Sequence, residues 1–101
     1  MAYALAVVAD PSRRRILDLL LERTRSVGEL VELTGLSQPG VSKHLRILRD
    51  NGLVSVRPDR QRRLYDVVPG PLAEIDDWLA PYRALWADRL DHLGRHLDEK
   101  E

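Results

Sequence analysis

Side chains that could read or hold DNA lie close together near the middle of the chain. They are Ser37, Gln38, Ser42, Lys43 and Arg46. Glutamine can pair with adenine through two hydrogen bonds, arginine and lysine can pair with guanine, and serine can contact a base or a phosphate. Ser37 is also a typical N-cap residue, and the free N–H groups at a helix start suit a phosphate. The set predicts a helix that enters the major groove of duplex DNA.

The sixteen basic and sixteen acidic side chains cancel over the whole chain, but they are unevenly distributed. Residues 37–63 hold seven basic and two acidic side chains, whereas residues 64–101 hold four basic and nine acidic ones. The middle segment includes Arg60, Arg62 and Arg63, which suit a minor groove or the DNA backbone. The asymmetry indicates a basic binding face and an acidic part held away from it. The alternative is that these charges form only a solvated surface.

Three helices are predicted from the spacing of apolar residues and from residues typical of helix ends. Asp10 and the proline after it begin a helix over 11–23. A serine and a glutamate three residues later form a capping box, which begins a second helix over 26–33. A glycine turn leads to a third helix over 37–51, after which Gly52 can adopt the positive φ of a helix end. Two helices joined by such a turn form a helix-turn-helix.

Two segments in which apolar and polar residues alternate, 53–57 and 63–67, are predicted to be strands. The residues between them, 58–62, form turns easily and are strongly basic. Together they predict a β-hairpin wing, whose basic part at 58–63 is a second DNA contact. The fold class is therefore mainly α with a small β-hairpin, a winged helix-turn-helix with its DNA-binding core at 10–68.

The two ends of the chain carry more apolar residues than so small a core can bury. Residues 1–9 would be apolar on every side of a helix, and residues 71–98 carry apolar side chains spaced by threes and fours. Pro81 predicts a kink or a helix boundary near Ala80, because proline removes a helical hydrogen bond and clashes with the preceding turn. We expect both segments to be dimerisation helices, although the aromatic residues could instead line an effector pocket. The expected interface residues are Tyr3, Leu5, Leu72, Ile75, Leu79, Tyr82, Trp86 and Leu93.

The stretch LSQPGVSKHLRIL over 36–48, followed by NGLV over 51–54 and the basic hairpin, resembles the ArsR/SmtB family of bacterial winged helix-turn-helix regulators. Residues 9–17, ADPSRRRIL, are similar to the family's second helix, so the resemblance covers about residues 9–68. It implies a homodimer joined through its first and last helices. Such a dimer represses transcription at an imperfect palindrome and often controls its own operon.

The chain departs from the metal sensors of that family because it contains no cysteine. Residues 26–30, SVGEL, stand where the arsenic and lead sensors carry their cysteine motif. His92, His96 and Glu99 are weak metal-ligand candidates on one helical face, but the upstream half of the zinc sensors' site is missing. A solvated helix end is the alternative, so we expect neither metal nor cofactor, and no effector is predicted. His44 flanks an apolar stripe, and we expect it to be partly buried and to touch the DNA backbone.

The sequence favours neither catalysis nor membrane insertion. There is no cysteine nucleophile, glycine-rich phosphate loop or HExxH motif, which argues against an enzyme. The longest apolar run, over 2–9, is eight residues long, whereas about 20 are needed to span a bilayer. We expect one cytoplasmic domain over 1–101 whose partners are double-stranded DNA and a second copy of the chain. The alternatives are a protein-binding or purely dimerising module, and sensing of a metal or small molecule added to DNA binding.

Overall fold

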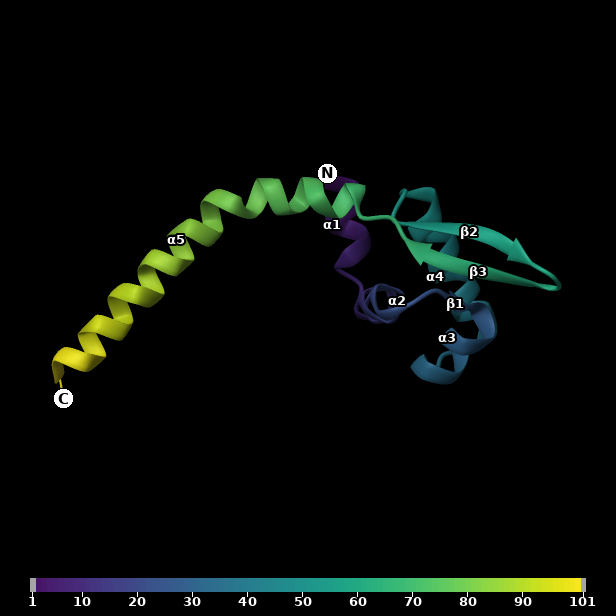
Figure 1. The fold of residues 1–101 in the computed structure, drawn as a ribbon, viewed down its shortest axis with the longest axis horizontal. Coiled ribbons are helices and arrows are strands. Elements are labelled where there is room, and N and C mark those ends of the chain that lie inside the picture. The colour runs from purple at the N-terminus through teal and green to yellow at the C-terminus, as the bar shows by residue number, and fades with distance from the viewer. Residues whose placement is uncertain (1, 101) are drawn as a thin grey trace.

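The computed structural model describes the backbone of residues 2–100 and the side chains of residues 4–92. Five helices and three strands make up this described part (Figure 1). In chain order they are α1 (Ala2–Val8), α2 (Pro11–Glu22), β1 (Arg25–Ser26), α3 (Val27–Thr34), α4 (Gln38–Asp50), β2 (Val54–Asp59), β3 (Arg62–Val67) and α5 (Gly70–Lys100). The strands form one antiparallel sheet in the order β1-β3-β2. The predicted winged helix-turn-helix is confirmed.

Side chains cap the starts of the helices where the sequence predicted them. The Asp10 carboxylate accepts hydrogen bonds from the backbone N–H groups of Ser12, at 2.9 Å, and Arg13, at 3.1 Å. The Ser26 hydroxyl accepts from the Glu29 N–H, and the Glu29 carboxylate accepts from the Ser26 N–H, which completes the capping box. These bonds satisfy N–H groups that have no partner within the helix. They fix where α2 and α3 begin.

The same hydrogen bonds lower the pKa values of the two capping carboxyl groups. The backbone N–H of Arg13 is the main cause for Asp10, and the backbone N–H of Ser26 is the main cause for Glu29. A carboxyl whose pKa is lower in the folded state stabilises the fold when ionised. That contribution is complete above the unfolded-state pKa of about 4, and it is lost as the pH falls through the folded-state value.

We therefore expect the midpoint of urea unfolding to fall between pH 5 and pH 3. In the double variant Asp10→Asn, Glu29→Gln the midpoint should fall less, because neither replacement titrates and asparagine still caps a helix. Urea titrations followed by circular dichroism at both pH values measure the difference. An equal fall in the variant and the parent protein would show that other carboxyl groups control the acid sensitivity.

The turn between α3 and α4 is held by a glycine and a serine. Gly35 ends α3 with a φ of 75°, in the left-handed region where a side chain would be strained. The Ser37 hydroxyl then caps α4 by accepting from the N–H of Gly40 at 3.1 Å. A Cβ on Gly40 would lie only 3.1 Å from that hydroxyl oxygen, so glycine leaves room for the cap. Gly52 has a φ of 71° after α4, as predicted.

The sheet differs from the prediction in two ways. The strand β1 was not predicted, since it has only two residues and exists through pairing with β3. The hairpin turn is also shorter than the predicted 58–62, because Pro58 and Asp59 belong to β2 and the turn contains only Arg60 and Gln61. Since β2 lies at the edge of the sheet, its proline is tolerated there. Arg60 takes a φ of 59°, which allows so tight a turn.

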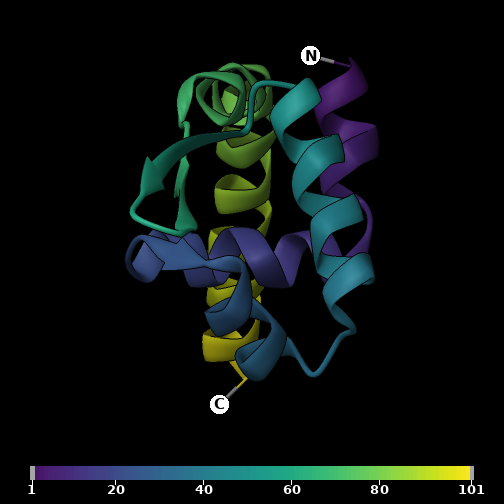
Figure 2. The same cartoon turned by 90° about the vertical axis from the view of Figure 1, so that its right-hand side faces the viewer.

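The core lies where α2, α3 and α4 pack against each other and against the sheet, and Figure 2 shows α2 crossing between α4 and the hairpin. Its fully buried side chains are Ile16, Leu30, Val41, Leu45, Leu48 and Leu53. The buried side chains of α4 all come from one face of that helix. Its opposite face is left to solvent.

The helix α5 packs against α1 near its start and then runs away from the rest of the molecule (Figure 1). Its 31 residues give it a length of about 46 Å. It continues through Pro81, so the helix boundary that was one of two expected outcomes near Ala80 is not observed. The helix bends instead, as Figure 1 shows, which is how a helix accommodates an internal proline.

Candidate nucleic-acid interface

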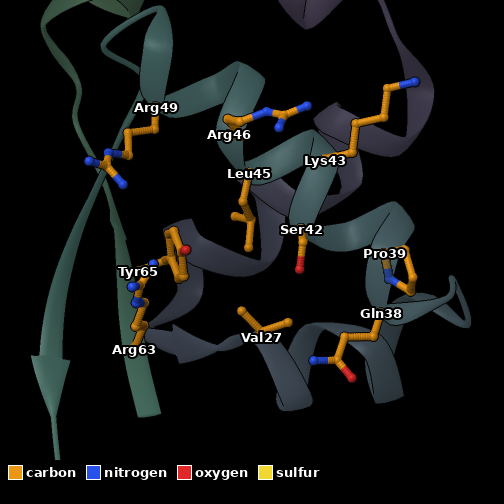
Figure 3. A pocket seen from close by; sticks show the side chains of 10 residues that line it. All are labelled: Val27, Gln38, Pro39, Ser42, Lys43, Leu45, Arg46, Arg49, Arg63 and Tyr65. Atoms are coloured by element: carbon orange, nitrogen blue, oxygen red, sulfur yellow. The ribbon is translucent and has the colours of Figure 1, made fainter.

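A hollow of about 500 Å³ separates α4 from the wing (Figure 3). Most of its wall comes from exposed side chains of α4, and the far wall comes from β3. Apolar side chains form part of the lining. The lining residues are Val27, Gln38, Pro39, Ser42, Lys43, Leu45, Arg46, Arg49, Arg63 and Tyr65. The geometry thus joins the predicted recognition helix and the wing into one surface.

Five of the predicted DNA contacts meet in this hollow. They are Gln38, Ser42, Lys43, Arg46 and Arg63. The four on α4 are spread over little more than two helical turns, so side chains of one helix can follow successive base pairs in a groove. In Figure 3 Ser42 points into the hollow, whereas Lys43 points away from its centre.

The other predicted contacts lie elsewhere. Ser37 is exposed at the start of α4, but its hydroxyl already accepts the capping hydrogen bond from Gly40. Arg60 and Arg62 lie at the wing tip, where Asp59 and Gln61 line a second hollow with them. The structure does not bring these two arginines together with the residues on α4.

His44 is half-buried and does not line the hollow. Its Nδ1 is buried and has no hydrogen-bond partner among the described residues. His44 is close enough to Asp10 to contribute, after the backbone N–H of Arg13 and other causes, to the low pKa of that carboxyl. The expected partial burial is confirmed, and the side chain belongs to the region where α4 meets the start of α2.

Arg49 belongs to the hollow although the sequence prediction did not include it. It lies three residues after Arg46 and is exposed on the last turn of α4. Figure 3 shows its side chain reaching toward the wing strands. Residues three apart on a helix are neighbours, so the spacing from Arg46 could have identified Arg49.

The hollow is strongly cationic because basic side chains line it and no carboxylate does. Four basic side chains line it, and none of them has an ion-pair partner in the described part of the chain: Lys43, Arg46, Arg49 and Arg63. Of the three wing arginines outside the hollow, Arg57 and Arg62 are paired, whereas Arg60 at the tip has no ion-pair partner among the described side chains. Arg57 lies 3.7 Å from the Asp66 carboxylate, and Arg62 lies 3.3 Å from the Asp59 carboxylate. Unpaired positive charge is therefore concentrated between α4 and β3.

The expected dimer residues fall into three groups. Ile75 is buried within the single chain, and Leu72 packs against the core. Leu5 and Leu79 are half-buried. Tyr82 and Trp86 are exposed, with 45% and 51% of their surface accessible. The side chains of Tyr3 and Leu93 lie outside the described residues.

An exposed apolar strip runs along α5 beyond its contact with α1. We define this strip as Trp78, Tyr82, Leu85, Trp86 and Leu90. The rings of Trp78 and Tyr82 contact each other at an interplanar angle of 47°, with their centres 5.2 Å apart. The five side chains are spaced by three, four or one along the helix, so they share one broad face.

Only one of the three weak metal-ligand candidates has a described side chain. His92 is exposed, whereas the side chains of His96 and Glu99 lie outside the described part. Among the side chains that are described, no three potential ligands come close enough together to hold a metal ion. None of the described helices combines the length and the apolar character needed to cross a membrane.

The fold and the cationic hollow define a winged helix-turn-helix protein with a basic recognition face. Residues 10–56 match the sequence model of the family described as "Bacterial regulatory protein, arsR family". The chain belongs to this family, which consists of transcriptional regulators and not of enzymes.

Known relatives cover most of the chain. The uncharacterized HTH-type transcriptional regulator Rv0081 of Mycobacterium tuberculosis H37Rv is 42% identical over 69 residues, which are 67% of this chain and 60% of that protein. The transcriptional repressor SdpR of Bacillus subtilis 168 is 32% identical over 71% of this chain and 80% of its own length. The crystal structure of the ArsR family transcriptional regulator RHA00566 has a TM-score of 0.74 and 27% identity, covering 85% of this chain and 94% of that one. The chain thus spans about three fifths of Rv0081 and most of the other two proteins.

Proposed function

We propose that this protein is a sequence-specific transcriptional repressor that binds a palindromic operator in duplex DNA as a homodimer. The observation that carries the proposal is the carboxylate-free cationic hollow between α4 and the wing. A polyanion with two grooves matches it, since α4 can enter a major groove while the wing contacts the adjacent minor groove. The chromosome is cytoplasmic in bacteria, so this is also where we expect the protein to act.

The roles of the residues follow from where they lie. Gln38, Ser42 and Arg46 line the hollow from α4, and their side chains supply the donors and acceptors that read base edges. Lys43 is exposed on the same helix and suits a phosphate. Ser37 and the backbone N–H of Gln38 lie at the start of α4, where a phosphate is also favoured.

The homodimer is supported by the exposed apolar strip on α5. Large apolar side chains that gather on one exposed face typically mark an interaction surface. The strip lies on a helix whose distal part contacts nothing else within the described chain (Figure 1). A second copy brings an identical strip, and twofold pairing of identical surfaces is the commonest way in which proteins form dimers. Such a dimer presents two copies of α4 to two half-sites.

Binding to DNA from the protein's own promoter tests the proposal. We expect a palindromic site whose half-sites are about 34 Å apart, or one helical turn. The affinity should fall steeply as salt rises, because phosphate contacts release counterions. Fluorescence anisotropy with promoter fragments and a scrambled duplex measures both properties. Equal and weak affinity for all fragments would contradict sequence-specific regulation, and capture of a specific protein instead would support the protein-binding alternative.

Replacing Arg46 by alanine should weaken specific binding by about 1–3 kcal/mol, because a guanidinium that pairs with guanine is lost. The same anisotropy assay gives this value as the change in operator affinity relative to the scrambled duplex. Arg14→Ala is the matched control, since Arg14 is an exposed arginine on α2 that does not line the hollow. If both variants lose the same affinity, Arg46 contributes only general charge.

A further inference from the structure

Two arginines from different elements face the same carboxylate-free space. Arg49 comes from the last turn of α4, and Arg63 is the second residue of β3. Both line the main hollow, and both also line a smaller hollow of about 300 Å³ whose other walls are Val56 and Pro58. The helix dipole favours a cation at the last turn of α4, but it does not account for a second arginine across the gap.

Like charges that share one space repel each other, and here no acid relieves the repulsion. Arg49 and Arg63 have no ion-pair partner among the described side chains, whereas Arg57 and Arg62 of the same hairpin lie 3.7 Å and 3.3 Å from the carboxylates of Asp66 and Asp59. An anion between Arg49 and Arg63 would remove the repulsion and accept hydrogen bonds from two planar guanidinium groups. Phosphate oxygens match that fork geometry closely.

The position of Arg49 and Arg63 indicates which anion they bind. When α4 lies in a major groove and the wing lies in the adjacent minor groove, one sugar-phosphate strand separates the two grooves. That strand must pass between α4 and the hairpin, which is where Arg49 and Arg63 lie. The neighbouring Val56 and Pro58 offer no side-chain donor or acceptor to a base edge.

We propose that Arg49 and Arg63 form a clamp on the DNA backbone strand that separates these two grooves. The inference rests on the proposed DNA binding and adds a ranking within it. Arg49 and Arg63 hold phosphate without reading sequence, and Arg57, which is paired with Asp66, contributes little. The clamp fixes the register of α4 on the duplex, because it holds the strand at the edge of the groove that α4 reads.

Salt-dependent binding of the full-length variants tests the clamp. Arg49→Ala and Arg63→Ala should each weaken binding to the operator and to a scrambled duplex by similar factors. Each should also reduce the slope of log affinity against log salt by about 1. Arg57→Ala is the matched control and should leave the slope close to that of the parent protein, because Arg57 lies beside the Asp66 carboxylate and does not line the hollow. All three side chains are exposed, and circular dichroism verifies that each variant is folded.

Neutral phosphates locate the contact. In the operator duplex, one phosphate at a time is replaced by a methylphosphonate along the strand that separates the two grooves. We expect one or two adjacent positions at which the parent protein loses affinity, while Arg49→Ala and Arg63→Ala lose much less at those same positions. Coincidence of the sensitive positions for both variants supports a clamp on one strand.

Three results would overturn the clamp while leaving DNA binding intact. The first is an unchanged salt slope for Arg49→Ala and Arg63→Ala. The second is an equal change for the control Arg57→Ala. The third is a loss of affinity confined to the operator, which would make the two arginines base readers. If the parent protein itself shows no salt-sensitive binding to any duplex, the proposed function fails and the clamp fails with it.

Discussion

Replacing Trp86 by glutamate is expected to convert the proposed homodimer into a folded monomer that has lost binding to the proposed operator. Trp86 lies in the exposed strip of α5, with 51% of its surface accessible, so the single chain does not need it for its core. A charge buried at the dimer contact without a partner is strongly unfavourable. A monomer contacts only one half-site, so the operator affinity should fall by at least about 10³-fold, toward nonspecific binding.

Sedimentation velocity gives the oligomeric state, and anisotropy with operator DNA gives the affinity. Leu21→Glu is the control, since Leu21 is a still more exposed leucine, at 76% accessible, and lies on α2 outside the strip. It should leave both the oligomeric state and the affinity unchanged. A Trp86→Glu protein that remains dimeric would show that another surface joins the subunits.

Leu48→Ala should cause the largest loss of stability among the substitutions considered. Leu48 is fully buried on α4 and belongs to the core shared with α2 and the sheet. Removing its side chain leaves a cavity and should lower the free energy of unfolding by about 2–5 kcal/mol. That is a large part of the roughly 5–15 kcal/mol typical of a domain.

Urea unfolding at a fixed protein concentration measures this loss, because the stability of a dimer depends on concentration. Leu33→Ala is the control, since Leu33 is 45% exposed on α3 and should cost no more than about 0.5 kcal/mol. A loss below about 1 kcal/mol for Leu48→Ala would mean that the core closes around the cavity. In that case the position of α4 would not depend on tight packing beneath it.

Local signals explain why the helices could be predicted so closely. The caps at Asp10, Ser26 and Ser37 and the left-handed glycines, Gly35 and Gly52, act on the few residues around them. Each signal is therefore visible in a short window of sequence. The predicted helix bounds agree with the structure to within one or two residues.

Pairing between distant segments explains what could not be predicted. The strand β1 consists of two residues that need β3, some forty positions later, to exist at all. Thr24, just before β1, donates a hydrogen bond to the Asp66 carboxylate next to that pairing. The hairpin turn is short for the same reason, because the pairing of Pro58 with Arg63 keeps both residues in the strands.

The sequence predicted which residue types line the candidate site, but not which of the charged side chains are paired. The sequence placed Gln38, Ser42, Lys43 and Arg46 on one surface, and the structure confirms that they share it. It could not separate paired from unpaired arginines, because the Arg62–Asp59 contact depends on the two-residue turn between them. Arg49 was not among the predicted contacts, although its spacing from Arg46 puts it beside that residue on α4. Only the folded chain places it beside Arg63.

Different parts of α5 serve the folding of one subunit and the proposed choice of a partner subunit. Only the start of α5 takes part in the subunit's own packing, through Leu72 and Ile75. The side chains of residues 80–92 are all exposed, so they can change without weakening the rest of the fold. In the proposed dimer, exchanging this distal segment between two such proteins would also exchange the choice of partner subunit. Several such regulators could then be present in one cell without forming mixed dimers.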